Sequence, residues 1–206
     1  MCYSVESSAI SFGLGFPASI YLLMQKNKFT KHIGLFFSAV VLMQLAEFFM
    51  WIDQDCGVIN NLATKSVTFI LMLQAYFLIL GGYIFKTIPI PKNIYKIILI
   101  IVTIYTILIS IRPFLINKKY CTKPNKCNAL QWDGFNEFMK YFNALSYYFW
   151  IFILFAIALS LQSNECLIVT ILGVIFLYLN ENKNIMTQYT RWCYYSAGIP
   201  IILSFL

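Results

Sequence analysis

The feature that most constrains this chain is a series of long apolar runs separated by short polar connections. A membrane-spanning α-helix needs about 20 mostly apolar residues, and the runs approach that length. The predicted helices cover residues 8–24, 33–52, 66–85, 94–116, 139–161, 166–179 and 186–206. The sixth is short for a complete crossing. We therefore expect an all-α fold, a polytopic transmembrane bundle of about seven helices that forms one domain over residues 1–206.

The composition agrees with a lipid environment. Hydrophobic residues make up 60% of the chain and charged residues 11%, whereas roughly a quarter of the residues in a soluble domain are charged. Much of a soluble domain's surface must face water, so a chain of this size could not cover so many apolar side chains. The net charge of +7 comes mainly from lysines between the runs, where they would meet anionic lipid headgroups. The lipid bilayer, and no nucleic acid, is the expected partner.

The orientation is predicted from lysines and cysteines together. Lys26, Lys28 and Lys31 place the first connection in the cytoplasm by the positive-inside rule, but four lysines in the loop 117–138 contradict the pattern on the other side. Crossing parity places four cysteines on one face of the membrane: Cys2, Cys56, Cys121 and Cys127. Disulfides persist in oxidising compartments, so we predict that the N-terminus is outside or lumenal.

Four cysteines allow three pairings. Short separation favours Cys121 with Cys127, which leaves Cys2 for Cys56. The alternative is free thiols, with Cys2 as a palmitoylation site if the N-terminus is cytosolic. The single histidine, His32, belongs to the opposite face, and the cysteine spacings are not those of zinc ligands. We predict no metal site and no cofactor.

Charged side chains inside a membrane are costly and usually mark a functional site or a buried pair. Glu47 lies five residues from the end of the second predicted helix, which is about 8 Å deep at 1.5 Å per residue. Gln44 and Trp51 precede and follow it by three and four positions, so the three side chains lie near one helical face.

Two arginines are predicted at a similar depth. Arg112 and Arg191 each lie a few residues from the outer end of their helices, and a guanidinium group can neutralise a carboxylate. Gln74 could extend this polar layer. One interpretation is a small polar chamber, open to the outer face, that binds a solute or relays a proton. The other is structural: a Glu–Arg pair locks the bundle and the second arginine reaches the headgroups.

Short motifs resemble those of a known group of proteins. The opening Met1-Cys2-Tyr3-Ser4, the block Leu42 to Trp51, which contains Met-Gln-Leu-Ala-Glu, and Trp192-Cys193 are similar to an uncharacterised family of small multi-pass membrane proteins from giant DNA viruses and some microbes. The resemblance implies a polytopic membrane fold and a viral origin, hence a host or virion membrane. It implies no activity, but it adds weight to Gln44, Glu47 and Trp51 as site residues.

Three functions follow as hypotheses. The first is a protein that binds or moves a small polar solute or ion through the polar layer. The second is a structural or scaffolding protein of a virion or host-derived membrane, with a homo-oligomer or another membrane protein as partner. The third is an intramembrane enzyme that acts on lipid with Glu47 as acid or base. It ranks last because no nucleophile with a base partner is recognisable, and we do not expect an enzyme.

Overall fold

The computed structural model describes residues 4–125, 129–133 and 196–205. Within them the elements are α1 (Val5–Met24), α2 (Lys28–Ile52), α3 (Val58–Phe85), α4 (Lys92–Leu115), β1 (Lys123–Pro124), β2 (Leu130–Gln131) and α9 (Ile199–Leu203). The helices α1 to α4 are long and apolar enough to cross a membrane. The predicted mostly helical fold is therefore confirmed, whereas the count of about seven helices and the orientation stay predictions. The predicted helices 139–161 and 166–179, and most of 186–206, lie outside the described residues.

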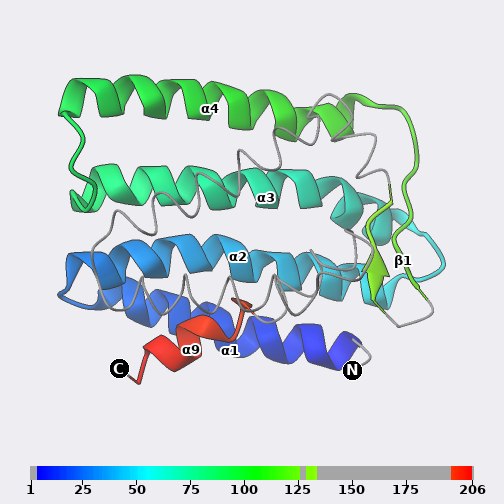
Figure 1. Ribbon diagram of the computed structural model, residues 1–206. Coiled ribbons are helices and arrows are strands. Elements are labelled where there is room, and N and C mark those ends of the chain that lie inside the picture. The colour runs from blue at the N-terminus through cyan, green and yellow to red at the C-terminus, as the bar shows by residue number, and fades with distance from the viewer. Residues whose placement is uncertain (1–3, 126–128, 134–195, 206) are drawn as a thin grey trace.

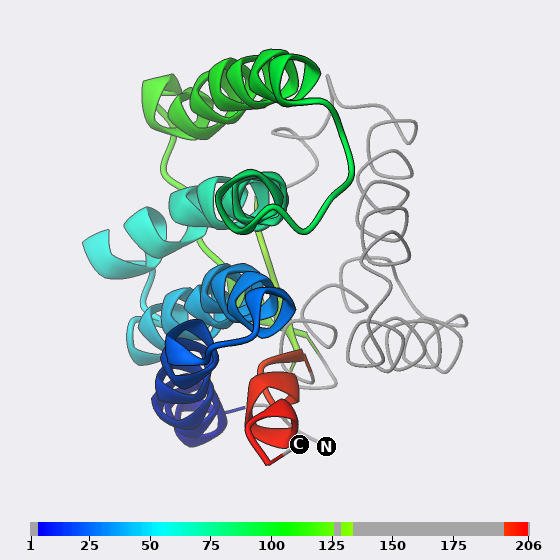
Figure 2. The same cartoon turned by 90° about the vertical axis from the view of Figure 1, so that its left-hand side faces the viewer.

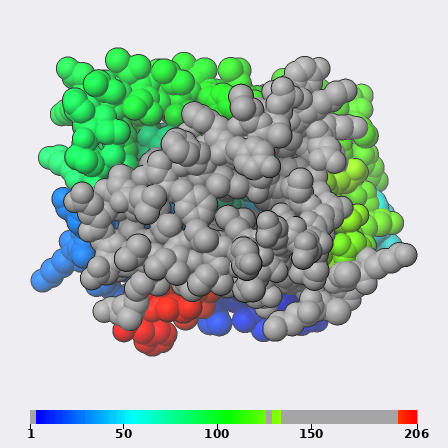
Figure 3. Space-filling model, in the orientation of Figure 1, coloured from blue at the N-terminus to red at the C-terminus, as the bar shows by residue number. Residues whose placement is uncertain are grey.

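The four long helices stand side by side in chain order, and each runs antiparallel to the one before (Figure 1). Seen from one end they form a curved row, with α9 beside α1 (Figure 2). The space-filling view also places the residues of α9 against α1 at the surface (Figure 3). At one end of the bundle α2 ends, α3 begins and α4 ends. We call this end of the bundle the disulfide end.

The bounds of α1, α2 and α4 fall close to the predicted ones, but α3 begins at Val58 instead of residue 66. Its first two turns carry Asn60, Asn61 and Lys65, and a search for apolar runs cannot find such a polar extension. A helix of 28 residues is about 42 Å long, against about 30 Å for the hydrocarbon core. The polar turns therefore extend beyond the apolar layer at the disulfide end.

At the opposite end of the bundle, a buried histidine joins α2 to α3. His32 of α2 is fully buried, and its Nε2 lies 2.6 Å from the Leu78 carbonyl oxygen of α3. Because a carbonyl can only accept, Nε2 carries the proton, and Nδ1 accepts from the Thr87 hydroxyl at 2.7 Å. Both ring nitrogens are satisfied, so His32 fixes α2 against α3.

Two apolar clusters hold the described helices together. One joins α2, α3 and the β1–β2 hairpin at the disulfide end, and it includes Met43, Met50, Val67, Leu130 and Trp132. The other joins α1, α2 and α9. Lipid tails are as apolar as these side chains, so the stabilisation of contacts between membrane helices comes mainly from close van der Waals packing.

Candidate functional site

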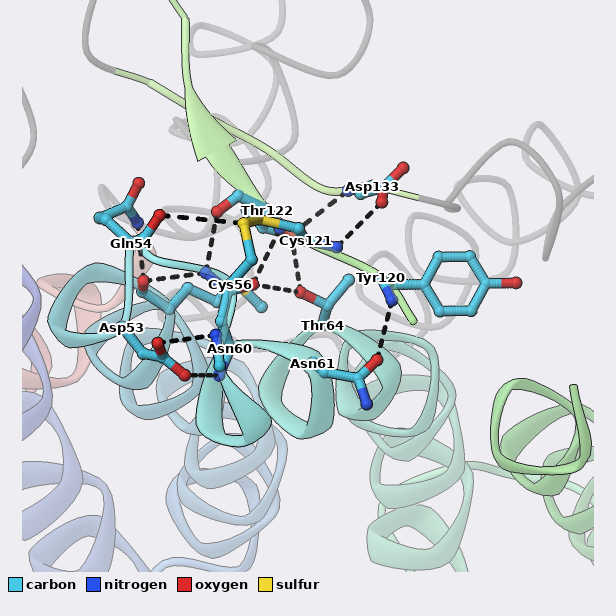
Figure 4. Close-up of a disulfide and its surroundings, with 12 residues drawn as sticks. Asp53, Gln54, Cys56, Asn60, Asn61, Thr64, Tyr120, Cys121, Thr122 and Asp133 are labelled. Atoms are coloured by element: carbon cyan, nitrogen blue, oxygen red, sulfur yellow. Dashed lines mark hydrogen bonds between the residues drawn. A yellow bond between two sulfur atoms is a disulfide. The ribbon is translucent and has the colours of Figure 1, made fainter. Parts of the chain in front are cut away.

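A dense polar network caps the disulfide end (Figure 4). It begins at Asp53, directly after α2, whose carboxylate accepts the backbone N–H groups of Gly57 at 2.8 Å and Asn60 at 2.9 Å. These are among the N–H groups that a helix leaves without an internal partner in its first turn. Asp53 therefore caps α3 and explains why this helix starts ahead of the apolar run.

Asn60 is the centre of the network, and it is fully buried. Its Nδ2 donates to the carbonyl oxygens of Met50 at 3.1 Å and Thr122 at 3.0 Å. Its Oδ1 accepts the Thr122 backbone N–H at 2.8 Å and the Thr64 hydroxyl at 3.2 Å. One amide thus joins α2, α3 and the segment before β1, and all of its hydrogen-bonding capacity is used.

A disulfide between Cys56 and Cys121 also joins the start of α3 to the segment before β1. The prediction that both cysteines lie on one face is confirmed, but the favoured pairing of Cys121 with Cys127 is wrong, and with it Cys2 with Cys56. Short sequence separation misled the prediction, since the antiparallel helices α3 and α4 bring residues 65 positions apart to a Cα–Cα distance of 5.2 Å. Cys2 and Cys127 lie outside the described residues.

The segment before β1, which Asn60 and the disulfide hold in place, positions the β1–β2 hairpin. The strands pair Lys123 with Gln131 and Pro124 with Leu130. Beyond β2, the Asp133 carboxylate accepts the Cys121 N–H at 2.9 Å, and its own N–H donates to the Thr122 hydroxyl at 3.2 Å. These bonds hold the neighbouring Trp132 against the helices, where its side chain is 4% exposed.

Glu47 lies beneath the hairpin. Its side chain is 4% exposed, Gln44 is fully buried, and Gln44 Nε2 donates to Glu47 Oε2 at 3.0 Å. The Trp132 indole N–H is near the same carboxyl group. Among the described residues, Glu47 Oε1 and Gln44 Oε1 have no hydrogen-bond partner. The predicted chamber was open to the outer face, whereas this carboxyl group is enclosed.

The other predicted site residues lie in different places. Trp51 shares the face of α2 with Glu47 and is partly buried beside the same apolar cluster. Arg112 is near the end of α4, which packs on α3 (Figures 1 and 2), so α3 separates it from α2, and no ion pair joins it to Glu47 in the described part of the chain. Arg191 lies outside the described residues.

Gln74 is deeper in the bundle than Glu47. The Asn60–Met50 and His32–Leu78 hydrogen bonds set the register of α2 and α3, and this register places Glu47 level with about position 63. Gln74 is therefore about 16 Å further along the helix axis at 1.5 Å per residue. Its side chain is fully buried, and both amide atoms have no hydrogen-bond partner among the described residues. It does not extend the Glu47 layer.

Sequence reasoning missed Asn60, Thr64, Thr122 and the role of Trp132. The signal available was the spacing of Asn60 and Thr64, which places two polar side chains on one face of a helix. The sequence does not reveal that this face contacts the loop, because its partner Thr122 is 62 positions away from Asn60. Within the described ranges, no group of three or more His, Cys, Asp or Glu residues could hold a metal ion.

The cap should respond to acid through Asp53. The backbone N–H of Asn60, followed by that of Gly57, lowers the pKa of Asp53 below its usual value. A carboxylate with a lowered pKa stabilises the fold above its unfolded pKa of about 4, and the contribution is lost as pH falls through the folded value. We expect Asp53→Asn to lower the thermal midpoint at neutral pH, with a difference from wild type that shrinks as the pH falls below about 4.

Tryptophan fluorescence of the purified protein in detergent would report both midpoints across this pH range. Asp55→Asn, at an exposed carboxylate two positions away, controls for the loss of one negative charge. A difference between Asp53→Asn and wild type that stays constant with pH would contradict the assignment of this carboxylate as the cap.

Comparison with known proteins identifies no relative of this chain. No protein-family model matches it, and neither a curated protein nor a solved structure does. The resemblance to small membrane proteins of giant viruses stays a prediction. The identity that can be stated is architectural: an integral membrane protein with four long apolar helices in its described part and a disulfide-linked cap at one end of them.

Proposed function

We propose that this protein binds or moves a small polar solute or ion at the polar layer near the disulfide end, with Glu47 as the binding group. One observation carries the proposal: a buried carboxyl group whose Oε1 has no hydrogen-bond partner among the described residues. Buried polar groups are normally hydrogen-bonded, and an exception calls for an explanation such as a bound water or ion.

The chemistry of the site favours a cationic species. An ionised carboxylate buried without an opposite charge is very costly, and it can be neutralised by a proton or by a bound cation. Gln44 Oε1 is a second acceptor without a partner in the described part of the chain, and it belongs to the side chain that already donates to Glu47. Two oxygen atoms on adjacent turns suit a proton or a small monovalent cation.

We also propose that the disulfide end faces the outside or a lumen, since disulfides persist in oxidising compartments. The lysines Lys26 and Lys28 at the opposite end agree with a cytoplasmic location by the positive-inside rule. A cation arriving from the outside would then meet Glu47 about 8 Å below the end of α2.

Glu47→Gln tests the proposed function. The substitution keeps the size and one acceptor oxygen but removes the titratable charge, so we expect ion-driven current in proteoliposomes to fall by at least tenfold. Currents would be recorded under gradients of protons, sodium and potassium in turn. Glu6→Gln, the same change at an exposed position of α1, is the matched control and should leave the current unchanged. Full activity in a folded Glu47→Gln protein would end the proposal.

A structural role is the second candidate, and the cap itself favours it. Exposed lysines lie on and beside the disulfide-linked hairpin, at Lys118, Lys119 and Lys123. A rigid, positively charged cap suits the docking of an acidic partner in the same membrane. Stoichiometric co-purification of a partner that is lost on charge reversal of these lysines would support it. A monomer that conducts ions would count against it.

A further inference from the structure

We infer that Lys65, where α3 meets the end of α4, binds the phosphate group of an anionic lipid. The site is separate from Glu47 and does not depend on the function proposed above. The side chain of Lys65 is 9% exposed, and its Nζ donates to the carbonyl oxygen of Ile116, directly after α4, at 3.3 Å. This lysine therefore holds its charge against the bundle instead of extending it into water.

The charge of Lys65 has no counter-charge in the described part of the chain. An ammonium group has three N–H donors, and the hydrogen bond of Lys65 ends on a neutral carbonyl. Its other contact is aromatic, since Nζ lies 5.8 Å from the centroid of the Tyr120 ring. Buried charges are normally paired, and no carboxylate of the described residues pairs with this one. A bound anion would supply the missing charge.

Tyr120 brings a second ammonium group to the same place. Its side chain is fully buried, and its backbone N–H donates to Asn61 Oδ1 of α3 at 2.8 Å. The ring points away from the disulfide, on the side of Asn61 (Figure 4). Lys118 Nζ lies 5.2 Å from the centroid of this ring. Two positive charges on one ring should attract an anionic headgroup more strongly than a zwitterionic one.

The depth of Lys65 matches that of lipid phosphate groups. The apolar run of α3 covers residues 66–85, and at 1.5 Å per residue it spans about 30 Å, the thickness of the hydrocarbon core. Lys65 therefore lies at the boundary between hydrocarbon and headgroups, where phosphates are plentiful and lysines attract anionic lipids. The exposed side chains of α4 near this end are apolar, among them Leu108, Ile111 and Leu115, and they suit the acyl chains.

A purely structural role for Lys65 makes a different prediction. The bond to Ile116 satisfies one of the carbonyl groups that a helix leaves without a partner at its end, and any N–H donor of sufficient length can make it. Lys65→Gln keeps such a donor and removes the charge, whereas Lys65→Arg keeps both. Stability without lipid should therefore be similar in the two variants, and lipid binding should separate them.

Native mass spectrometry of the full-length protein in detergent tests the site. Phosphatidylglycerol would be titrated into the protein, and the affinity for the first bound lipid would be measured. We expect Lys65→Gln to weaken this affinity by at least tenfold, because a hydrogen bond between charged groups is lost. Lys65→Arg should stay close to wild type. Lys123→Gln, the same change at an exposed position of the same end, is the matched control and should also bind like wild type.

Equal affinity of wild type and Lys65→Gln for phosphatidylglycerol would overturn the site. An equal loss in Lys123→Gln would overturn it too, because the attraction would then be a general property of the charged end. Thermal midpoints without lipid, from tryptophan fluorescence, would show that each variant is folded.

A second measurement uses the wild-type protein alone, so it does not depend on the folding of a variant. A ligand that binds the folded state raises the thermal midpoint. We expect a larger rise with phosphatidylglycerol than with phosphatidylcholine, and little rise with inorganic phosphate, because acyl chains must deliver the phosphate to this depth. Equal rises with the two lipids would contradict an anionic headgroup. A rise with inorganic phosphate as large as that with phosphatidylglycerol would mean that the site takes a free anion instead of a lipid.

Discussion

Replacing Asn60 with alanine is expected to destabilise the protein by about 3 kcal/mol, since each buried group left without its partner costs about 1–3 kcal/mol. The Asn60 amide uses both donors and both acceptor positions, and its partners are the Met50 carbonyl, both backbone groups of Thr122 and the Thr64 hydroxyl. The side chain is fully buried, so water cannot replace it without rearrangement. The substitution breaks the cap where three segments meet.

Unfolding of the purified protein in mixed micelles with increasing denaturing detergent, followed by tryptophan fluorescence, would measure this loss. Asn93→Ala, at an exposed position in the first turn of α4, removes the same group from a site without buried partners and should change the stability by less than about 0.5 kcal/mol. A loss at Asn60 no larger than at Asn93 would mean that the cap contributes little to stability.

Replacing Gly34 with alanine is expected to separate α1 from α2. The expected loss of stability is about 3 kcal/mol, in the upper part of the range for overpacking. A Cβ at this position would lie 2.7 Å from the Leu23 backbone nitrogen and 2.8 Å from the Ser19 carbonyl oxygen. Both are backbone atoms of α1, so no side-chain rotation can make room. Small residues allow membrane helices to approach this closely.

Gly13→Ala is the matched control for Gly34→Ala. A Cβ at Gly13 would meet nothing within 4 Å, and alanine is a better helix former than glycine by about 1 kcal/mol. The same chemical change should therefore destabilise at one position of the α1–α2 pair and be neutral or stabilising at the other. The same unfolding assay measures both, and losses of equal size would show that the α1–α2 crossing is not as close as described.

The sequence alone was sufficient for the class of protein and for most of four helices. An apolar run of about 20 residues has few stable environments other than lipid, so α1, α2, α3 and α4 could be placed from hydropathy. The depth of Glu47 and its face shared with Gln44 also followed, because the helix repeat relates nearby positions in sequence. These are local properties, and each is contained in one helix.

The tertiary structure alone decided the contacts between segments. The Cys56–Cys121 disulfide, the anchoring of Thr122 on Asn60 and the burial of Trp132 near Glu47 all join residues that are more than 60 positions apart. Such contacts depend on which helices are neighbours and in what register, and hydropathy carries no information on either. The separation of Arg112 from Glu47 by α3 has the same physical reason: a common depth in the membrane does not define a position around the bundle.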